Sequence, residues 1–198
     1  MHVAIMGTGT VGETLARALT EVDHDVVLGS RSIGAADATL EASVDVRSHA
    51  SAIEGADAVV LAVPPAAAVE LAERHAGALA DLAVVDPTNE YPDPADDLAV
   101  AERIAAAAPE AHVAKAFNTI GAEHMADPSV GDGTATMFVA GDDDPGLETA
   151  TALAADLGFD PFVAGDLEMA RHLENLGRLW IDLSIEHGRD VAFRLLRG

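Results

Sequence analysis

The chain has 198 residues, of which 49% are hydrophobic, so it can bury a substantial core as one domain with an extension. It has no cysteine, which excludes disulfides and thiolate zinc sites, and its 34 acidic against 11 basic residues give a net charge of −23, which disfavours a nucleic-acid partner. An acidic surface is typical of adaptation to high salt. We expect a cytoplasmic protein, because the sequence shows neither a signal peptide nor an apolar run near the roughly 20 residues that span a membrane.

The N-terminal segment has the pattern of a strand, a glycine-rich turn and a helix. An apolar run at 2–6 leads into a complete G-x-G-x-x-G, made of Gly7, Thr8, Gly9, Thr10, Val11 and Gly12. The first glycine permits a tight turn, the second lets the backbone approach a pyrophosphate, and the third lets the following helix pack closely. The N-terminus of that helix, expected at 13–22, faces the phosphates. The sequence therefore predicts a dinucleotide site.

The end of the second strand, expected at 25–28, distinguishes NAD(H) from NADP(H). An NAD site usually carries an acidic residue about 20 residues past the glycines, bonded to the ribose 2′-OH. Here Ser30 and Arg31 follow the strand, whereas Asp23 and Asp25 come too early. A hydroxyl and a guanidinium are donors for a 2′-phosphate. Ser30 and Arg31 therefore predict NADP(H).

The remaining chain alternates helices and strands. After a short helix at 33–42 and a small strand at 44–47, we expect helices at 48–54, 66–79, 98–108, 122–126 and 147–157. Between them we expect strands at 58–63, 82–85, 112–117, 134–140 and 159–163. The alternation predicts an α/β fold, a doubly wound parallel Rossmann sheet with a small C-terminal α/β extension that ends in a long helix.

The long helix begins after Asp166 and carries an apolar stripe. The stripe contains Met169, Leu173, Leu176, Trp180 and Leu183, and a second one adds Ile181 and Ile185. This surface exceeds what a helix on one sheet needs, so we expect a homodimer interface as well as packing on its own domain. We expect one domain over 1–198, with a nucleotide-binding core at about 1–115 and an acceptor-side and dimerisation segment at about 116–198.

Ligands bind at the carboxyl ends of the strands in such a sheet. Besides the turns at 7–12 and 29–32, the loops at 63–65, 86–89 and 117–122 reach that edge and should frame the nicotinamide and a second substrate. Val63 and Pro64 offer an apolar wall. Lys115, the only lysine, precedes the last loop and either takes part in the chemistry or positions the loop. No catalytic triad and no histidine set with metal-ligand spacing is present, so we assign neither a catalytic residue nor a metal.

Several segments together resemble the coenzyme F420-dependent NADP oxidoreductase family, over essentially the whole chain. They are GTGTVGETLA, VVLGSRS, AVVLAVP, KAFNTIGAEHM and ARHLENLGRLWIDLSIEHG. The resemblance implies a small Rossmann protein in which a deazaflavin (coenzyme F420) or a flavin stacks on the nicotinamide of NADP(H).

The resemblance also implies roles by position. The pyrophosphate would be held by Thr8, Gly9, Thr10 and Val11, and the 2′-phosphate by Ser30 and Arg31. The nicotinamide would be flanked by Val63 and Ala122. The deazaflavin would be lined by Asn118, Thr119 and Ile120. Asn118 and Gly121 stand where the family has His and Pro, which leaves the acceptor open. No basic residue follows Arg31 at 34–36, where the family has one.

The leading hypothesis is hydride transfer between NADPH and F420 or a flavin, for which two stacked rings chiefly suffice. Lys115 or Asn118 could donate a hydrogen bond to the acceptor. An NADPH-dependent imine or carbonyl reductase and a non-catalytic NADP(H)-binding sensor remain alternatives, since no acid–base pair is evident in the sequence.

Overall fold

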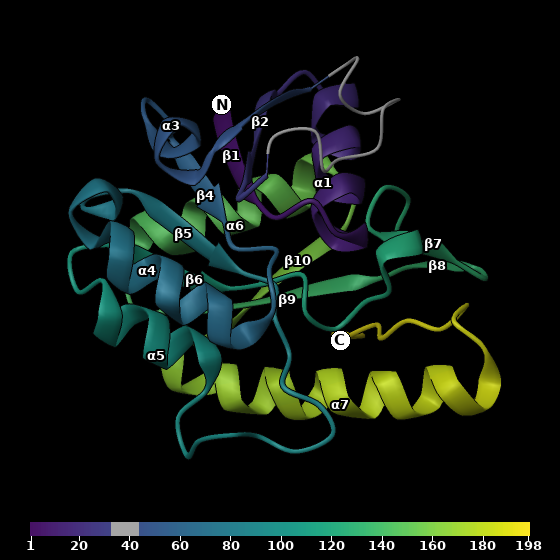
Figure 1. Cartoon of the computed structure of the whole chain (residues 1–198). Helices are drawn as coiled ribbons and strands as arrows, with labels where there is room; N and C mark the ends of the chain where they lie inside the picture. Colours follow the sequence, from purple (N-terminus) through teal and green to yellow (C-terminus); the bar gives the residue numbers. More distant parts are fainter. Residues whose placement is uncertain (33–43) are drawn as a thin grey trace.

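The structure, a computed structural model, describes residues 1–32 and 44–198 and is built around one eight-stranded sheet (Figure 1). The strand order is β10-β9-β6-β5-β4-β1-β2-β3. These strands are β1 (His2–Met6), β2 (Asp25–Ser30), β3 (Asp45–Ser48), β4 (Ala58–Val60), β5 (Ala83–Asp86), β6 (His112–Lys115), β9 (Thr136–Gly141) and β10 (Asp160–Gly165). The expected α/β, mostly parallel Rossmann-like fold is confirmed.

Helices cover both faces of the sheet. They are α1 (Thr10–Glu21), α3 (His49–Ile53), α4 (Pro65–Leu79), α5 (Val100–Ala107), α6 (Asp144–Asp156) and α7 (Ala170–His187), with 3-10 turns η1 (Ala122–His124) and η2 (Leu167–Met169). Alternate residues of β1 point to opposite faces: Val3 and Ile5 join the core under α1 and α6, whereas Ala4 and Met6 join the core under α3, α4 and α5. Both faces of the sheet are therefore buried from solvent, as is usual for a parallel sheet.

The last two strands differ from the parallel arrangement that the sequence predicts. β9 pairs antiparallel with β6, and β10 runs parallel to β9, so both are reversed relative to the first six strands. A parallel neighbour would need a crossover, usually a long helix, whereas an antiparallel neighbour does not. The link between β6 and β9 contains only η1 and a small antiparallel hairpin, β7 (Ser129–Val130) with β8 (Gly133–Thr134), in place of the unstructured link at 127–133 that lies between the expected helix and strand.

Two strands are shorter than expected, which places their final residues in loops. β4 ends at Val60 rather than at residue 63, because the N–H of Val63 turns back to the carbonyl of Leu61. β6 ends at Lys115, and Phe117 adopts a left-handed backbone with φ of +61°. Both loops reach the carboxyl edge of the sheet. The helix expected at 33–42 lies outside the described residues.

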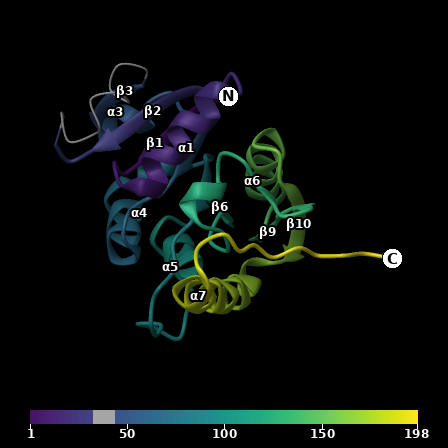
Figure 2. The ribbon, with the colours of Figure 1, turned by 90° about the vertical axis from the view of Figure 1, so that its right-hand side faces the viewer.

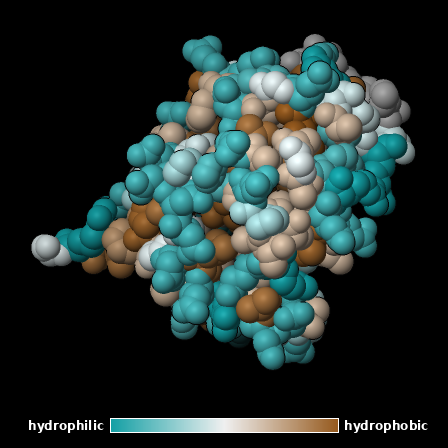
Figure 3. Space-filling model, turned by 90° about the vertical axis from the view of Figure 1, so that its left-hand side faces the viewer, coloured by the Kyte–Doolittle hydropathy of each residue, from teal (hydrophilic) through white to brown (hydrophobic). Residues whose placement is uncertain are grey.

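Helix α7 runs beside α5 along one side of the molecule (Figure 1), and the C-terminal residues turn back after it and pass β9, where the N–H of Thr136 donates to the Phe193 carbonyl (Figure 2). Leu173 and Trp180 are each only 4% exposed, so part of the apolar stripe faces the protein itself, whereas Leu179 and Ile185 remain exposed. Hydrophilic residues dominate the face drawn in Figure 3, in keeping with the net charge. No helix within the described ranges is both long and apolar enough to cross a membrane.

Candidate functional site

A cavity of about 1010 Å³ opens at the carboxyl edge of the sheet. Every loop that the sequence predicts at this edge contributes to its wall, through residues at 7–11, 30–32, 63–65, 87–89 and 117–122. The volume is at the upper limit of the roughly 300–1,000 Å³ typical of small-molecule sites. It is therefore large enough for a dinucleotide and part of a second ligand.

The glycine turn leaves a cradle for a phosphate group. A Cβ on Gly7, whose φ is +117°, would meet the Ala62 carbonyl at 2.2 Å, and a Cβ on Gly12 would meet the Gly7 carbonyl at 2.2 Å. A Cβ on Gly9 would meet nothing within 4 Å, so open space lies in front of this backbone. Gly9 also precedes the first turn of α1 without a side-chain cap, which leaves the amides of that turn available to an anion. Gly12 lies below the cavity and does not line it.

One end of the cavity gathers basic side chains from three separate elements. Ser30 and Arg31 line it from the end of β2, and two residues that the sequence analysis did not single out, His49 of α3 and Arg74 of α4, line it as well. Burial lowers the pKa of the His49 imidazole, and His75, Arg31 and Arg74 lower it further. In a protein of net charge −23, this cluster of basic side chains favours an anion at this end, where Glu70 of α4 also lines the cavity.

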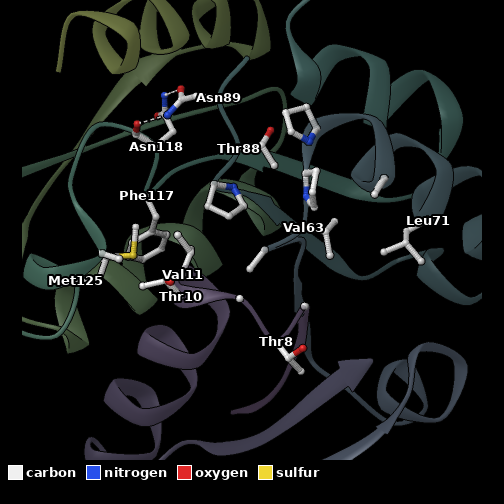
Figure 4. Close-up of a pocket in the computed structure, with 18 of the residues that line it drawn as sticks. Thr8, Thr10, Val11, Val63, Leu71, Thr88, Asn89, Phe117, Asn118 and Met125 are labelled. Atoms are coloured by element: carbon white, nitrogen blue, oxygen red, sulfur yellow. Dashed lines mark hydrogen bonds between the residues drawn. The ribbon is translucent and has the colours of Figure 1, made fainter. Parts of the chain in front are cut away.

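The other end is built around a pair of asparagines (Figure 4). The Asn118 amide donates to Asn89 Oδ1 at 2.9 Å and to the Leu173 carbonyl at 2.8 Å, and Asn89 donates to the Asn118 carbonyl at 2.6 Å. A Cβ on Gly177 of α7 would lie 2.4 Å from Asn89 Oδ1, so only glycine fits. Both amide hydrogens of Asn118 are therefore engaged within the protein, and its role toward an acceptor stays a prediction.

Lys115 is buried behind this end of the cavity. Its Nζ donates to Asp86 Oδ2 at 2.8 Å, to the Thr88 carbonyl at 2.6 Å and to Glu174 Oε1 at 2.9 Å. The side chain has no exposed surface and does not line the cavity, so in this structure Lys115 lies behind the wall and not in it. It positions the loop at 87–89 instead. Thr119, which is 2% exposed, likewise does not line the cavity.

Two polar atoms in the cavity wall have no partner among the described residues. They are Thr88 Oγ1 and Asn118 Oδ1, both buried. Figure 4 draws Thr88 between the side that carries Val63 and the side that carries Asn118 and Phe117. A polar group of a ligand would satisfy atoms at this position, since unpartnered buried polar atoms are rare and costly. This observation fits an amide-bearing ligand such as nicotinamide.

The end that carries the asparagine pair also contains residues that could not be assigned to it from the sequence. Phe117 and Met125 line the cavity, as do Trp180 of α7, Glu123 of η1 and Arg189 of the turn after α7. A bulky residue such as Phe117 is rarely left-handed, and such strain concentrates at functional sites. The single tryptophan could have drawn attention to α7, but its helical spacing does not reveal which face meets the cavity.

Known proteins share this fold. A family model described as "NADP oxidoreductase coenzyme F420-dependent" matches residues 2–90. A crystal structure from Arthrobacter sp. FB24, described as that of a "putative f420 dependent nadp-reductase", is 32% identical, covers 98% of this chain and 99% of its own, and superposes with a TM-score of 0.87. The chain belongs to the coenzyme F420-dependent NADP oxidoreductase family. It is thus a member of a family of NADP-dependent oxidoreductases, as the sequence predicts.

Other known proteins are less similar to this chain or match it over only part of their length. An imine reductase from Streptomyces aurantiacus is 17% identical, covers 94% of this chain and 63% of its own, and has a TM-score of 0.71, which shows a shared fold. The human metalloreductase STEAP2 is 26% identical over 88% of this chain and 35% of its own length, and the rat metalloreductase STEAP3 is 29% identical over 87% and 35%. The chain spans about a third of the length of these curated relatives.

Proposed function

We propose that the protein transfers hydride between NADPH and a flavin-like acceptor, either the deazaflavin coenzyme F420 or a flavin. The observation that carries this proposal is that one cavity joins a glycine turn and a basic cluster to a second end lined by the aromatic side chains Phe117 and Trp180. Hydride transfer between two planar rings needs chiefly close and parallel placement, without an acid or a base from the protein.

We assign the nucleotide to the glycine turn and the basic cluster. The backbone at Thr8, Gly9, Thr10 and Val11 would hold the pyrophosphate. Gly9 would let the chain approach it, because no atom fills the space where a Cβ would stand. Ser30 and Arg31 would hold the 2′-phosphate, with Arg74 in place of the basic residue that is missing at 34–36.

We assign the nicotinamide to the middle of the cavity. Val63, Pro64 and Ala122 would flank the ring, and Thr88 Oγ1 would meet its carboxamide. Ile120 and the Asn89–Asn118 pair would line the acceptor, with Trp180 at its edge. When bound, the acceptor supplies the ring that exchanges hydride with the nicotinamide, while the protein excludes water and holds both rings in register.

The division of the chain and its assembly are part of the proposal. Residues at about 1–115 would serve as the nucleotide-binding core, and those at about 116–198 as the acceptor side. Leu179 is 48% exposed and Ile185 71% exposed on α7, which fits a second copy of the chain against this helix. Sedimentation velocity of an Ile185→Asp variant tests this: a shift from dimer to monomer is expected, whereas a monomeric wild type would exclude the interface.

The test of function is NADPH oxidation followed with F420, FMN, FAD, a cyclic imine or no acceptor. Turnover with F420 or a flavin is expected. Tight NADPH binding without turnover on any acceptor would instead favour a sensor, and turnover with the imine alone would favour an imine reductase. Arg31→Ala should raise the KM for NADPH and leave that for the acceptor unchanged, because the lost guanidinium faces only the nucleotide.

A further inference from the structure

A single arginine stands at the acceptor end of the cavity. Of the described residues, three arginines line the cavity, and two of them, Arg31 and Arg74, belong to the basic cluster at the other end. The third, Arg189, lies beside Trp180 and Glu123. A protein of net charge −23 repels an anionic acceptor, so a cation at this point matters for which acceptors bind.

The guanidinium of Arg189 is held in a fixed orientation. Gly188, with φ of +89°, ends α7 and turns the chain back, and the indole of Trp180 donates to the Val191 carbonyl at 2.8 Å, which fixes this turn. The guanidinium carbon lies 5.1 Å from the centre of the Trp180 ring. Nε of Arg189 donates to Glu123 Oε1 and Nη2 to Glu123 Oε2 at 3.0 Å, a two-point ion pair.

This ion pair leaves part of the guanidinium available. Arginine has five N–H groups, and the pair with Glu123 uses one on Nε and one on Nη2. Nη1 has no hydrogen-bond partner in the part of the chain that the structure describes, and the Arg189 side chain is 58% exposed. Glu123 therefore orients the arginine while its charge weakens the attraction for a second anion. The pair also lowers the pKa of Glu123, which stays ionised at neutral pH.

We propose that Arg189 binds the anionic group on the side chain of the acceptor, namely a phosphate attached to a flavin or deazaflavin. The proposal rests on the proposed function, because it assumes that the acceptor ring lies against Ile120 and Trp180. It adds a requirement on the substrate: the ring carries a phosphorylated side chain that reaches the turn after α7. FMN and coenzyme F420 have such a side chain, whereas riboflavin has the flavin ring without the phosphate.

The test uses Trp180, the only tryptophan, as a reporter of binding. Quenching of its fluorescence is measured with FMN, riboflavin and F420 at saturating NADP⁺, at the lowest KCl concentration that keeps the protein folded, because salt screens exposed charges. The variants are Arg189→Gln, Glu123→Gln and Arg197→Gln. Arg197 is also in the C-terminal segment, is 57% exposed and pairs with Asp160. Arg197→Gln is therefore a control that removes the same positive charge as Arg189→Gln at a position outside the site.

The two members of the ion pair should act in opposite directions. Arg189→Gln should raise the Kd for FMN and F420 by roughly threefold to fivefold, as expected for one exposed ionic contact, and leave the Kd for riboflavin unchanged. Glu123→Gln should lower the Kd for FMN, because it removes the competing carboxylate. Arg197→Gln should change neither.

Other results would overturn the subsite. One is an equal Kd for FMN and riboflavin in the wild type. Another is a Kd that changes by the same factor for FMN and for riboflavin in both Arg189→Gln and Glu123→Gln, which would indicate that the ion pair only stabilises the fold. Turnover is measured separately. Phosphate discrimination that depends on Arg189, without NADPH oxidation by any of the three ligands, would keep the subsite and overturn the hydride-transfer proposal.

Discussion

The two ends of the cavity are built in different ways. At the end that we assign to the nucleotide, consecutive residues of the glycine turn line the wall, and the space in front of Gly9 is open because this residue has no side chain. At the acceptor end, the wall consists of side chains from segments far apart in sequence, and α7 holds them through Gly177 and Glu174. The first end depends on local chain geometry, whereas the second depends on how a distant helix docks.

This difference predicts that defects in α7 docking affect the acceptor and spare the nucleotide. The buried ion cluster of Lys115 with Asp86 and Glu174 joins β5 and β6 to α7, and Glu174 also accepts the Val100 N–H at the start of α5. A change in this cluster should therefore separate the two ends in a binding experiment.

Lys115→Met should have the largest effect. It leaves two carboxylates buried without their cation, which should lower the free energy of unfolding by about 3–5 kcal/mol, as is usual when one partner of a buried pair is removed. Urea unfolding measures this loss. Below the unfolding transition, FMN binding should weaken more than NADP⁺ binding, and an equal loss of both would contradict the separation of the two ends.

Glu174→Gln is the matched control for Lys115→Met. The glutamine keeps an oxygen for Lys115 and for the Val100 N–H, and it reduces the net charge of the cluster from −1 to zero. We expect a much smaller change in the urea midpoint than for Lys115→Met. A loss as large as that of Lys115→Met would mean that the charge of Glu174, not its hydrogen bonding, holds α7.

The glycine turn offers a second contrast between neighbouring positions. Gly12→Ala places a methyl group 2.2 Å from the Gly7 carbonyl, so the helix must shift, and we expect a loss of about 1–3 kcal/mol in stability. Gly9→Ala meets no protein atom within 4 Å, so the fold should be unaffected while NADP⁺ binding weakens. Thermal unfolding and NADP⁺ titration of both variants measure this. Normal NADP⁺ binding by Gly9→Ala would contradict the assignment of the pyrophosphate.

The same difference between local and distant contacts explains which parts of the fold and of the site could be predicted from the sequence. The glycine turn, Ser30 and Arg31 could be recognised because each motif is contiguous and its backbone geometry follows from residue type. All of them except Gly12 line the cavity, and Gly12 takes the packing position that the motif implies. The alternation of elements likewise predicted the Rossmann sheet, because buried parallel strands and amphipathic helices have distinct periods.

Tertiary arrangement accounts for what the sequence did not reveal. Lys115 was noted as the only lysine, but nothing local shows that Glu174, 59 positions later, holds it inside the protein. The antiparallel direction of β9 depends on a short hairpin that carries little hydrophobic pattern. Trp180 and Arg189 reach the cavity only because α7 and the turn after it fold back. In each case the deciding partner is remote in sequence.

Arg74→Ala tests whether the basic cluster is a functional unit at the nucleotide end. Arg74 and Arg31 line the same cavity from α4 and from the end of β2. Removing one charged partner of the 2′-phosphate should raise the KM for NADPH by about fivefold to tenfold, and the KM for NADH should not change. Arg17→Ala, on α1 and outside the cavity lining, serves as the control. If Arg74→Ala keeps the wild-type preference for NADPH over NADH, then Arg74 does not contact the 2′-phosphate.

The smallest expected effect is a pH dependence of nucleotide binding through His49. In the ligand-free site, burial and then the nearby His75, Arg31 and Arg74 lower the pKa of His49, so its imidazole is mostly neutral at pH 7 and less than half of it is protonated at pH 6.5. A bound 2′-phosphate dianion favours the imidazolium and raises this pKa, so binding takes up protons, and the affinity for NADP⁺ should increase as the pH falls from 8 to 6.5.

We expect this increase to be about twofold to threefold, since the imidazole is only half-buried. NAD⁺, which lacks the phosphate, should show no such increase, and His49→Gln should remove it for NADP⁺. Isothermal titration in two buffers of different ionisation enthalpy measures the proton uptake directly. Equal proton uptake with both nucleotides would mean that the titrating group does not face the 2′-phosphate, and the basic cluster would then contribute a fixed charge from its arginines alone.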